Sequence, residues 1–112
     1  MPENLTVDDV MELDGNNPKE SQLLFEIVKS NKSRELSLAA VSQITFQKYL
    51  EWIAQNHVDD DIKCAAIPKL SNWNILKEIS ANQSEAQIVK STANKRLAEI
   101  KAKHSNVPKD EF

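Results

Sequence analysis

The densest group of potential metal ligands in the chain is a run of three aspartates at positions 59–61, preceded by His57. Hard cations such as Ca²⁺ and Mg²⁺ prefer carboxylate oxygens, which makes an ion site one interpretation. The run also lies where a helix is expected to begin, and acidic side chains there cap free backbone N–H groups and complement the helix dipole. Residues 33–35 and 85–87, which lie 26 positions earlier and later, reproduce no ligand set. We therefore interpret the run as a helix cap and expect no metal site.

Side chains suited to nucleophilic catalysis are few. Cys64 is the only cysteine, which excludes an internal disulfide and a thiolate zinc cluster, and its place on an apolar helix face indicates a buried structural thiol. His57 falls in an expected turn and His104 at an expected helix end, and neither has a serine, cysteine or acid partner at a recognisable spacing. Gly15 is the only glycine, whereas phosphate-binding loops and tight β-turns need several. We therefore expect no enzyme activity and no cofactor.

Composition and charge indicate one soluble domain in the cytoplasm. The 112 residues suffice for one modest core, and 40% apolar with 28% charged residues is typical of folded proteins. The sequence has no secretory signal and no apolar run long enough to span a bilayer, so no membrane partner is expected. Charge is uneven, with a net of −4 over residues 1–32 and +3 over residues 86–112. We interpret the basic end as a solvated helix face, because nucleic-acid binding usually needs a stronger basic footprint.

The strongest pattern is an internal repeat with a period of 26–27 residues. The apolar residues that coincide under a shift of 26 are Leu36, Ala39, Ala40, Val41, Ile44, Leu50 and Ile53 with Ile62, Ala65, Ala66, Ile67, Leu70, Leu76 and Ile79. The polar positions between them drift, as a shared burial pattern predicts. Within each unit, the apolar spacing indicates two short helices. A unit of this size cannot bury its apolar face alone, so it must stack on its neighbours.

The expected fold is therefore all-α, an α-solenoid of about three to four short helix pairs. We expect one domain over residues 1–104, with an atypical N-terminal cap over 1–19, a long C-terminal cap helix over 86–104 and a flexible tail over 105–112. N-cap residues are expected at equivalent positions before the first helix of each unit, namely Ser33, Asp59 or Asp60, and Ser84. Pro68 falls inside an expected helix and predicts a kink or an early end there.

Two stretches of the repeat share one spacing. They read Leu36-x-x-Ala-Ala-Val-x-x-Ile44 with Leu50-x-x-Ile53, and Ile62-x-x-Ala-Ala-Ile-x-x-Leu70 with Leu76-x-x-Ile79. These motifs resemble the short HEAT-like repeats of armadillo-type superhelices and are similar to leucine-rich variant repeats, over residues 20–100. The chain departs from the long HEAT form in its shorter period and in having serine or lysine where arginine usually follows the first apolar residue. The resemblance implies a right-handed superhelix whose second helices line a concave binding face.

Equivalent positions also predict which aromatic side chains face solvent. Trp52 corresponds to Glu26 and Glu78, and Trp73 corresponds to a glutamine, so both tryptophans are expected at the surface. Exposed tryptophans are enriched at binding hot spots. The competing interpretation is that both fold back onto neighbouring helices and pad the core. Tyr49 occupies an apolar position of the repeat and is expected in the core.

The predicted function is a non-catalytic protein–protein interaction module or adaptor that binds another protein, or a peptide segment, on the face of the second helices. The residues expected on that face are Gln47, Lys48, Glu51, Trp52, Gln55, Trp73, Asn74, Lys77 and Glu78. One alternative is a nucleic-acid-binding repeat protein that uses the basic C-terminal helix, through Lys90, Lys95, Arg96, Lys101 and Lys103. Another is an accessory subunit of an enzyme. Self-association into a homo-oligomer also stays open, because the ends of a solenoid leave apolar surface to cover.

Overall fold

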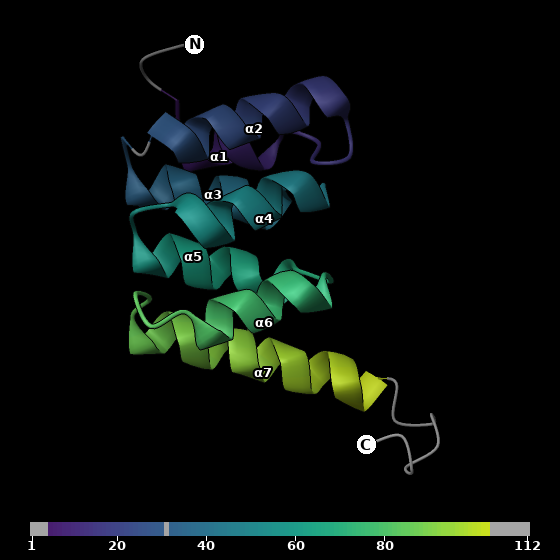
Figure 1. Ribbon diagram of the computed structural model, residues 1–112. Coiled ribbons are helices and arrows are strands. Elements are labelled where there is room, and N and C mark those ends of the chain that lie inside the picture. The colour runs from purple at the N-terminus through teal and green to yellow at the C-terminus, as the bar shows by residue number, and fades with distance from the viewer. Residues whose placement is uncertain (1–4, 31, 104–112) are drawn as a thin grey trace.

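The structure, a computed structural model, describes residues 5–30 and 32–103, and every regular element in these ranges is helical (Figure 1). In this part of the chain the elements are α1 (Val7–Met11), α2 (Pro18–Ser30), α3 (Arg34–Gln43), α4 (Gln47–Asn56), α5 (Asp60–Ala66), the 3₁₀ turn η1 (Ile67–Lys69), α6 (Trp73–Ala81) and α7 (Gln87–Lys103). The prediction of an all-α fold is confirmed. His104 and the predicted tail over 105–112 lie outside the described residues.

The helix starts follow the sequence repeat. The helices α3, α5 and α7 begin at residues 34, 60 and 87, and α4 and α6 begin at residues 47 and 73. The side chains of Ser33 and Asp59 accept hydrogen bonds from the first turns of α3 and α5, as predicted. The prediction for Ser84 is wrong, because α7 begins three residues later and the Ser84 N–H donates instead to the side chain of Asn82.

Pro68 ends α5 early. The α-helix stops at Ala66, and the proline falls in the first turn of η1, where its missing N–H removes no helical hydrogen bond. Of the two outcomes that the sequence predicts at Pro68, the early end is the one observed.

The helices form two layers. In the first layer α1 contacts α3, α3 contacts α5, and α5 contacts α7, so these four helices lie in a row. The helices α2, α4 and α6 form the second layer on one side of this row, toward the viewer in Figure 1. Each of them packs against the first-layer helix that follows it in the chain: α2 against α3, α4 against α5, and α6 against α7. Every helix pair therefore depends on the next pair for its burial.

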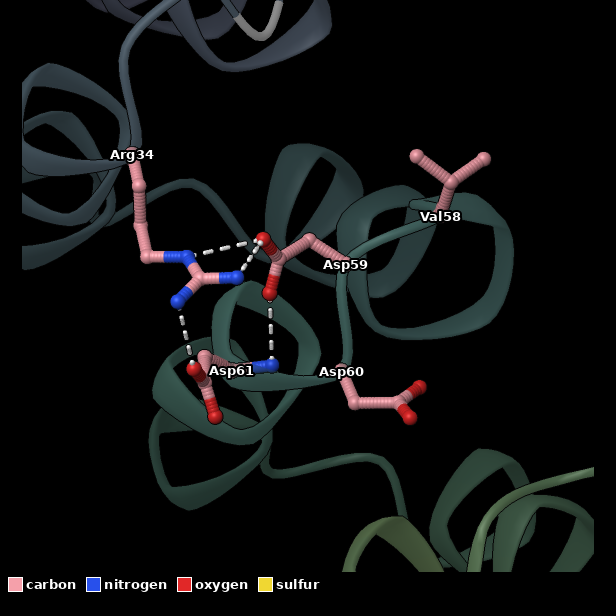
Figure 2. A pocket seen from close by; sticks show the side chains of 5 residues that line it. All are labelled: Arg34, Val58, Asp59, Asp60 and Asp61. Carbon is pink, nitrogen blue, oxygen red and sulfur yellow. Dashed lines mark hydrogen bonds and ion pairs between the residues drawn. The ribbon is translucent and has the colours of Figure 1, made fainter.

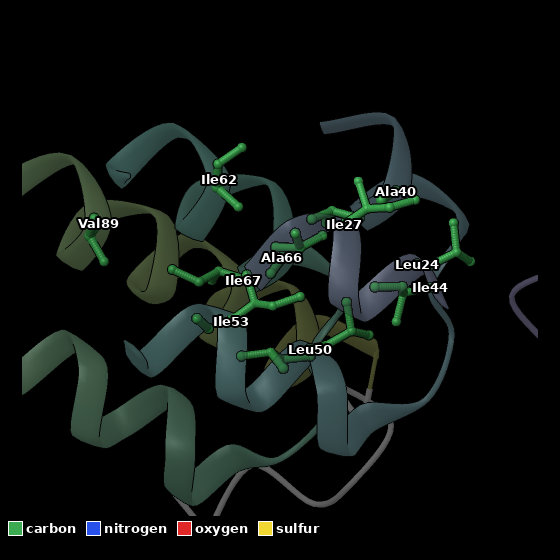
Figure 3. Close-up of a cluster of buried hydrophobic side chains, with 14 of the residues drawn as sticks. Leu24, Ile27, Ala40, Ile44, Leu50, Ile53, Ile62, Ala66, Ile67 and Val89 are labelled. Atoms are coloured by element: carbon green, nitrogen blue, oxygen red, sulfur yellow. The ribbon is translucent and has the colours of Figure 1, made fainter. Parts of the chain in front are cut away.

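The core lies between the two layers (Figure 3). Ala40, Ala66 and Ala93 occupy equivalent positions and are fully buried, and their small side chains let the first-layer helices approach closely. The large side chains that are fully buried come from both layers and include Leu24, Ile44, Leu50, Ile53, Ile62, Ile67, Leu70, Leu76 and Val89. Burial of each such side chain stabilises the fold by roughly 1.5–3 kcal/mol. The apolar positions of the repeat therefore supply the main driving force for stacking.

The loop between α1 and α2 touches the end of α3. A β-carbon at Gly15 would lie 1.5 Å from the backbone oxygen of Gln43, so only glycine permits this approach. The hydroxyl of Thr45 donates to the Gly15 carbonyl at 3.0 Å and holds the loop in place. None of the helices described here has both the length and the apolar character needed to cross a membrane.

Candidate protein-interaction surface

Four aromatic side chains join α2 to α4 on the second layer, and we call them the aromatic cluster: Phe25, Phe46, Tyr49 and Trp52. The rings of Phe25 and Tyr49 stack with their centroids 4.5 Å apart, and Trp52 meets Phe25 edge-on at 5.4 Å. The ring of Phe46, just before α4, lies 6.2 Å from that of Tyr49. Both arrangements suit the charge distribution of aromatic rings. Tyr49, predicted in the core, is half-buried because its ring belongs to this surface cluster.

Two lysines cover the stacked rings. The Lys29 ammonium lies 5.2 Å from the centroid of Phe25, and the Lys48 ammonium lies 5.1 Å from that of Tyr49. Such cation–π contacts contribute roughly 0.5–1 kcal/mol at exposed sites. No cation among the described residues covers Trp52 in this way, and 38% of Trp52 is exposed. Trp52 therefore presents the open aromatic surface of the cluster.

The predicted contact residues fall into two groups, one on α4 and one on α6. Trp52 and Trp73 are 38% and 41% exposed, which confirms both as surface residues, although each buries more than half of its area. The other exposed members are Lys48, Gln55, Asn74, Lys77 and Glu78, and Glu51 is half-buried. Trp73 makes no ring contact with another described aromatic residue. The structure thus gathers Trp52 with aromatic residues that the sequence analysis did not select, and leaves Trp73 apart.

Gln47, also predicted as a contact residue, is engaged within the chain. Its Nε2 donates to the Lys69 carbonyl at 2.9 Å, and its Oε1 accepts from the Ser71 N–H at 3.0 Å. The amide therefore ties the start of α4 to the loop between η1 and α6. Its role in the structure is to position the loop that leads into Trp73.

A repeated hydrogen bond links each unit to the one before it. Gln43, Lys69 and Arg96 lie 26 and 27 residues apart, and each reaches back to the end of the preceding first-layer segment. The Gln43 amide donates to two carbonyls at and beyond the end of α1, at 2.9 and 2.8 Å. The Lys69 ammonium donates to two carbonyls in the last turn of α3, at 2.7 and 2.9 Å. The Arg96 Nε donates to the carbonyl that follows η1, at 2.8 Å. Carbonyls at helix ends lack intrahelical donors, so each unit completes its predecessor.

The equivalent positions 43, 69 and 96 hold an amide, an ammonium and a guanidinium in turn. The two cations are both partly buried. Burial lowers the pKa of Lys69, because its ammonium is desolvated between two units. Arg96 has a side chain only 16% exposed and also lies 3.5 Å from the carboxylate of Glu99. Arg96, which the nucleic-acid alternative requires, therefore already makes its contacts within the fold.

Arg34 of α3 binds the start of α5 (Figure 2). Its Nη2 and Nε contact one carboxylate oxygen of Asp59 at 2.9 and 3.0 Å, and its Nη1 contacts Asp61 at 3.2 Å. Burial raises the pKa of Asp59, but hydrogen bonds from Arg34 and from the N–H groups of Asp61 and Ile62, with the charge of Arg34, outweigh it and hold the pKa below its ordinary value. The carboxylate of Asp59 therefore stays charged to low pH.

The aspartate run thus caps a helix, as predicted. It lines an open polar pocket of about 340 Å³ with Arg34 and Val58, and in Figure 2 the Asp60 side chain points away from Arg34. Within the described ranges, no three His, Cys, Asp or Glu side chains are grouped so that they could hold a metal ion.

His57 and Cys64 both have structural partners. His57 is buried, its Nδ1 accepts from the Asp59 N–H at 3.0 Å, and its Nε2 lies 3.1 Å from the Val28 carbonyl. The neutral tautomer with its proton on Nε2 satisfies both contacts and links α4 to the end of α2. Cys64 of α5 is half-buried rather than buried, and its thiol accepts a hydrogen bond from the Thr92 hydroxyl of α7 at 3.4 Å.

The sequence contained a signal for Phe25, a member of the aromatic cluster that was not among the predicted contact residues. A shift of 26 residues places Phe25 on Glu51 and Lys77, a polar position like that of Trp52. The same comparison of equivalent positions that selected Trp52 therefore also selects Phe25.

Comparisons of the chain with models of protein families, with curated proteins and with solved structures return no match. The functional argument rests on the surface itself.

Proposed function

We propose that this chain is a non-catalytic protein-interaction module, a short right-handed α-solenoid that binds a segment of a partner protein on its second layer. The observation that carries the proposal is the aromatic cluster on α2 and α4, with Trp52 exposed at its edge. Rings held on rigid helices lose little conformational freedom when a partner covers them, and tryptophan buries a large area with few rotatable bonds. The lone thiol of Cys64 suits a reducing compartment such as the cytoplasm.

The solenoid part of the proposal is supported by features that recur along the chain. Helix starts recur at the same interval, Ala40, Ala66 and Ala93 share complete burial, and Gln43, Lys69 and Arg96 make the same backward hydrogen bond. Stacked units that contact only their neighbours would behave in this way. The second helices, which lie on one side of this stack, would then offer a surface for a helix or a peptide.

The nucleic-acid alternative has less support. Arg96 is engaged with a backbone carbonyl and Lys90 is half-buried, so at least two of its five cations are not fully available. No observation favours the alternative of an enzyme's accessory subunit.

The test is affinity capture from the native cell with three versions of the chain. The double variant Trp52→Ala/Trp73→Ala removes the two exposed rings, and Val58→Ala is the matched control, because Val58 is apolar, 84% exposed and outside the second layer. We expect at least one protein to bind the wild type and the control and to be lost with the double variant, while circular dichroism shows all three to be folded. Equal capture by all three versions would contradict the proposed surface.

A further inference from the structure

The two ends of the stack of helices carry opposite charge. Residues 5–30, which contain α1 and α2, hold six carboxylates and two lysines, a net charge of −4. Helix α7 holds five cations and one carboxylate, a net charge of +4. The residues between them, 32–86, hold seven carboxylates and six cations and are close to neutral. Since α1 and α7 lie at opposite ends of the row in Figure 1, the charge is separated along the row.

The outward face of α1 combines apolar and acidic side chains. Val7 and Met11 lie one turn apart and are 37% and 46% exposed. Asp8 and Glu12 lie beside them, also one turn apart, and both are exposed. The inward residue of this helix, Val10, is fully buried. The exposed face of α1 therefore carries Asp8 and Glu12, with Val7 and the partly exposed Met11 beside them, although the Met11 sulfur also accepts a hydrogen bond from the Ser42 hydroxyl of α3 at 3.7 Å.

The outward face of α7 is complementary. A stripe of exposed residues with alternating spacings of three and four runs along one side of the helix and consists of Ile88, Ser91, Lys95, Ala98 and Ala102. Three of the five have small side chains, which would let another helix approach closely. Ile88 is 59% exposed and supplies apolar area, and Lys95 supplies positive charge.

We infer that copies of this chain associate head to tail, with the acidic face of α1 on one copy docking on the outward stripe of the basic helix α7 on the next. The contact would extend the first layer from one copy to the next, with α1 following α7 in the row. The two faces differ, so the interface is heterologous and does not close on a dimer. Opposite charges would fix the direction of stacking, and salt would weaken it. The second layer stays free, so this inference does not rest on the proposed partner surface.

The first measurement is the mass of the purified chain as a function of protein and salt concentration, by light scattering after size exclusion and by sedimentation velocity. At about 20 mM salt we expect the average mass to rise above 12.7 kDa with protein concentration, and at about 500 mM salt to return to the monomer. A monomer under both conditions up to millimolar protein would overturn the inference.

Two charge-reversed variants test the direction. Asp8→Lys/Glu12→Lys alters only the α1 face, and Lys95→Glu/Lys103→Glu alters only α7; circular dichroism checks that both are folded. Each variant alone should be monomeric at low salt, because two charge reversals at one end bring the net charge of residues 5–30 from −4 to 0, or that of α7 from +4 to 0, and so remove the attraction between unlike ends. Mixing the two variants should restore association, because the lysines placed on α1 of one can then face the glutamates placed on α7 of the other, and the variant carrying all four changes should associate like the wild type. Association that survives reversal at either end, or failure of the fourfold variant to associate while folded, would overturn head-to-tail docking.

Discussion

The two layers of this molecule follow the repeat to different degrees. In the first layer, equivalent positions share both burial and bonding: Ala40, Ala66 and Ala93 are fully buried, and the residues at 43, 69 and 96 all donate to the preceding helix end. In the second layer, only the inward positions repeat, as Leu24, Leu50 and Leu76 do. The outward positions differ, with an aromatic cluster across α2 and α4 and a separate tryptophan on α6. The repeat therefore describes the packing, and the departures from it describe the surface.

The physical reason is the density of the core. A close-packed interior constrains the volume and shape of each side chain, so equivalent core positions keep similar residues. An outward position has no such constraint, and a large apolar ring there needs another explanation. This contrast is why we propose that a partner would bind on the second layer, and the predictions below measure it.

The largest expected difference is between two residues of the same helix, α4. Leu50 faces the core and is 1% exposed, whereas Trp52 faces outward. We expect Leu50→Ala to lower the free energy of unfolding by about 2–5 kcal/mol, because it leaves a cavity between the layers. Trp52→Ala should cost about 1 kcal/mol, mainly through the lost edge contact with Phe25. Urea unfolding of both variants checks this, and equal losses would mean that Trp52 serves the core.

The sequence could predict those parts of the fold that depend on residue type at a fixed interval. Shared apolar residues placed the helices, and Ser33 and Asp59 placed two of the caps. The backward hydrogen bonds escaped prediction, because three chemically different side chains fill the same role. Within the aromatic cluster, Trp52 was predicted at the surface because it differs in polarity from its equivalents, whereas Tyr49 shares the apolar character of its equivalents and was predicted in the core.

A second prediction concerns the contact between the α1–α2 loop and the first layer. Gly15→Ala would place a β-carbon against the Gln43 backbone oxygen, so the backbone of the loop or of the end of α3 must shift. We expect a loss of about 2–3 kcal/mol, as for other overpacked sites. Thermal unfolding measures it, with the exposed change Glu12→Ala as a control that should stay close to wild type. An unchanged stability of Gly15→Ala would show that the loop does not pack on α3.

A third prediction tests whether the residues at 43, 69 and 96 have the same structural role, which is to donate a hydrogen bond to the end of the preceding first-layer segment. Lys69→Gln places in the third unit the side chain that the second unit already uses, and it keeps a donor for the end of α3. Lys69→Met keeps the length but removes the donor, so two carbonyls lose their partner and stability should fall by about 1–2 kcal/mol.

Lys69 also has a signature in alkaline solution. Burial lowers its pKa in the folded state, so between that pKa and the ordinary lysine value the unfolded chain binds more protons, and stability contributed by this group rises with pH. Wild type should gain stability relative to Lys69→Gln over this interval in urea unfolding at a series of pH values. Equal stability of Lys69→Gln and Lys69→Met at neutral pH would show that the hydrogen-bond donor at position 69 is not needed.

The smallest expected effect is at the α4–α5 corner, where charge rather than packing links the units. The pKa of Asp59 is lowered in the folded state, so its charged form stabilises the fold above the ordinary aspartate pKa, and this contribution is lost as the pH falls through the lowered value. Arg34→Gln removes the main partner of Asp59. Because the Arg34 side chain is 59% exposed, the loss in free energy of unfolding at pH 7 should be about 1 kcal/mol or less. The difference between wild type and Arg34→Gln should shrink in urea unfolding as the pH falls through the lowered pKa of Asp59, because the carboxylate that Arg34 binds then becomes protonated. A difference that stays constant with pH would mean that Arg34 acts through the packing of its aliphatic stem, and the corner would then resemble the rest of the first layer.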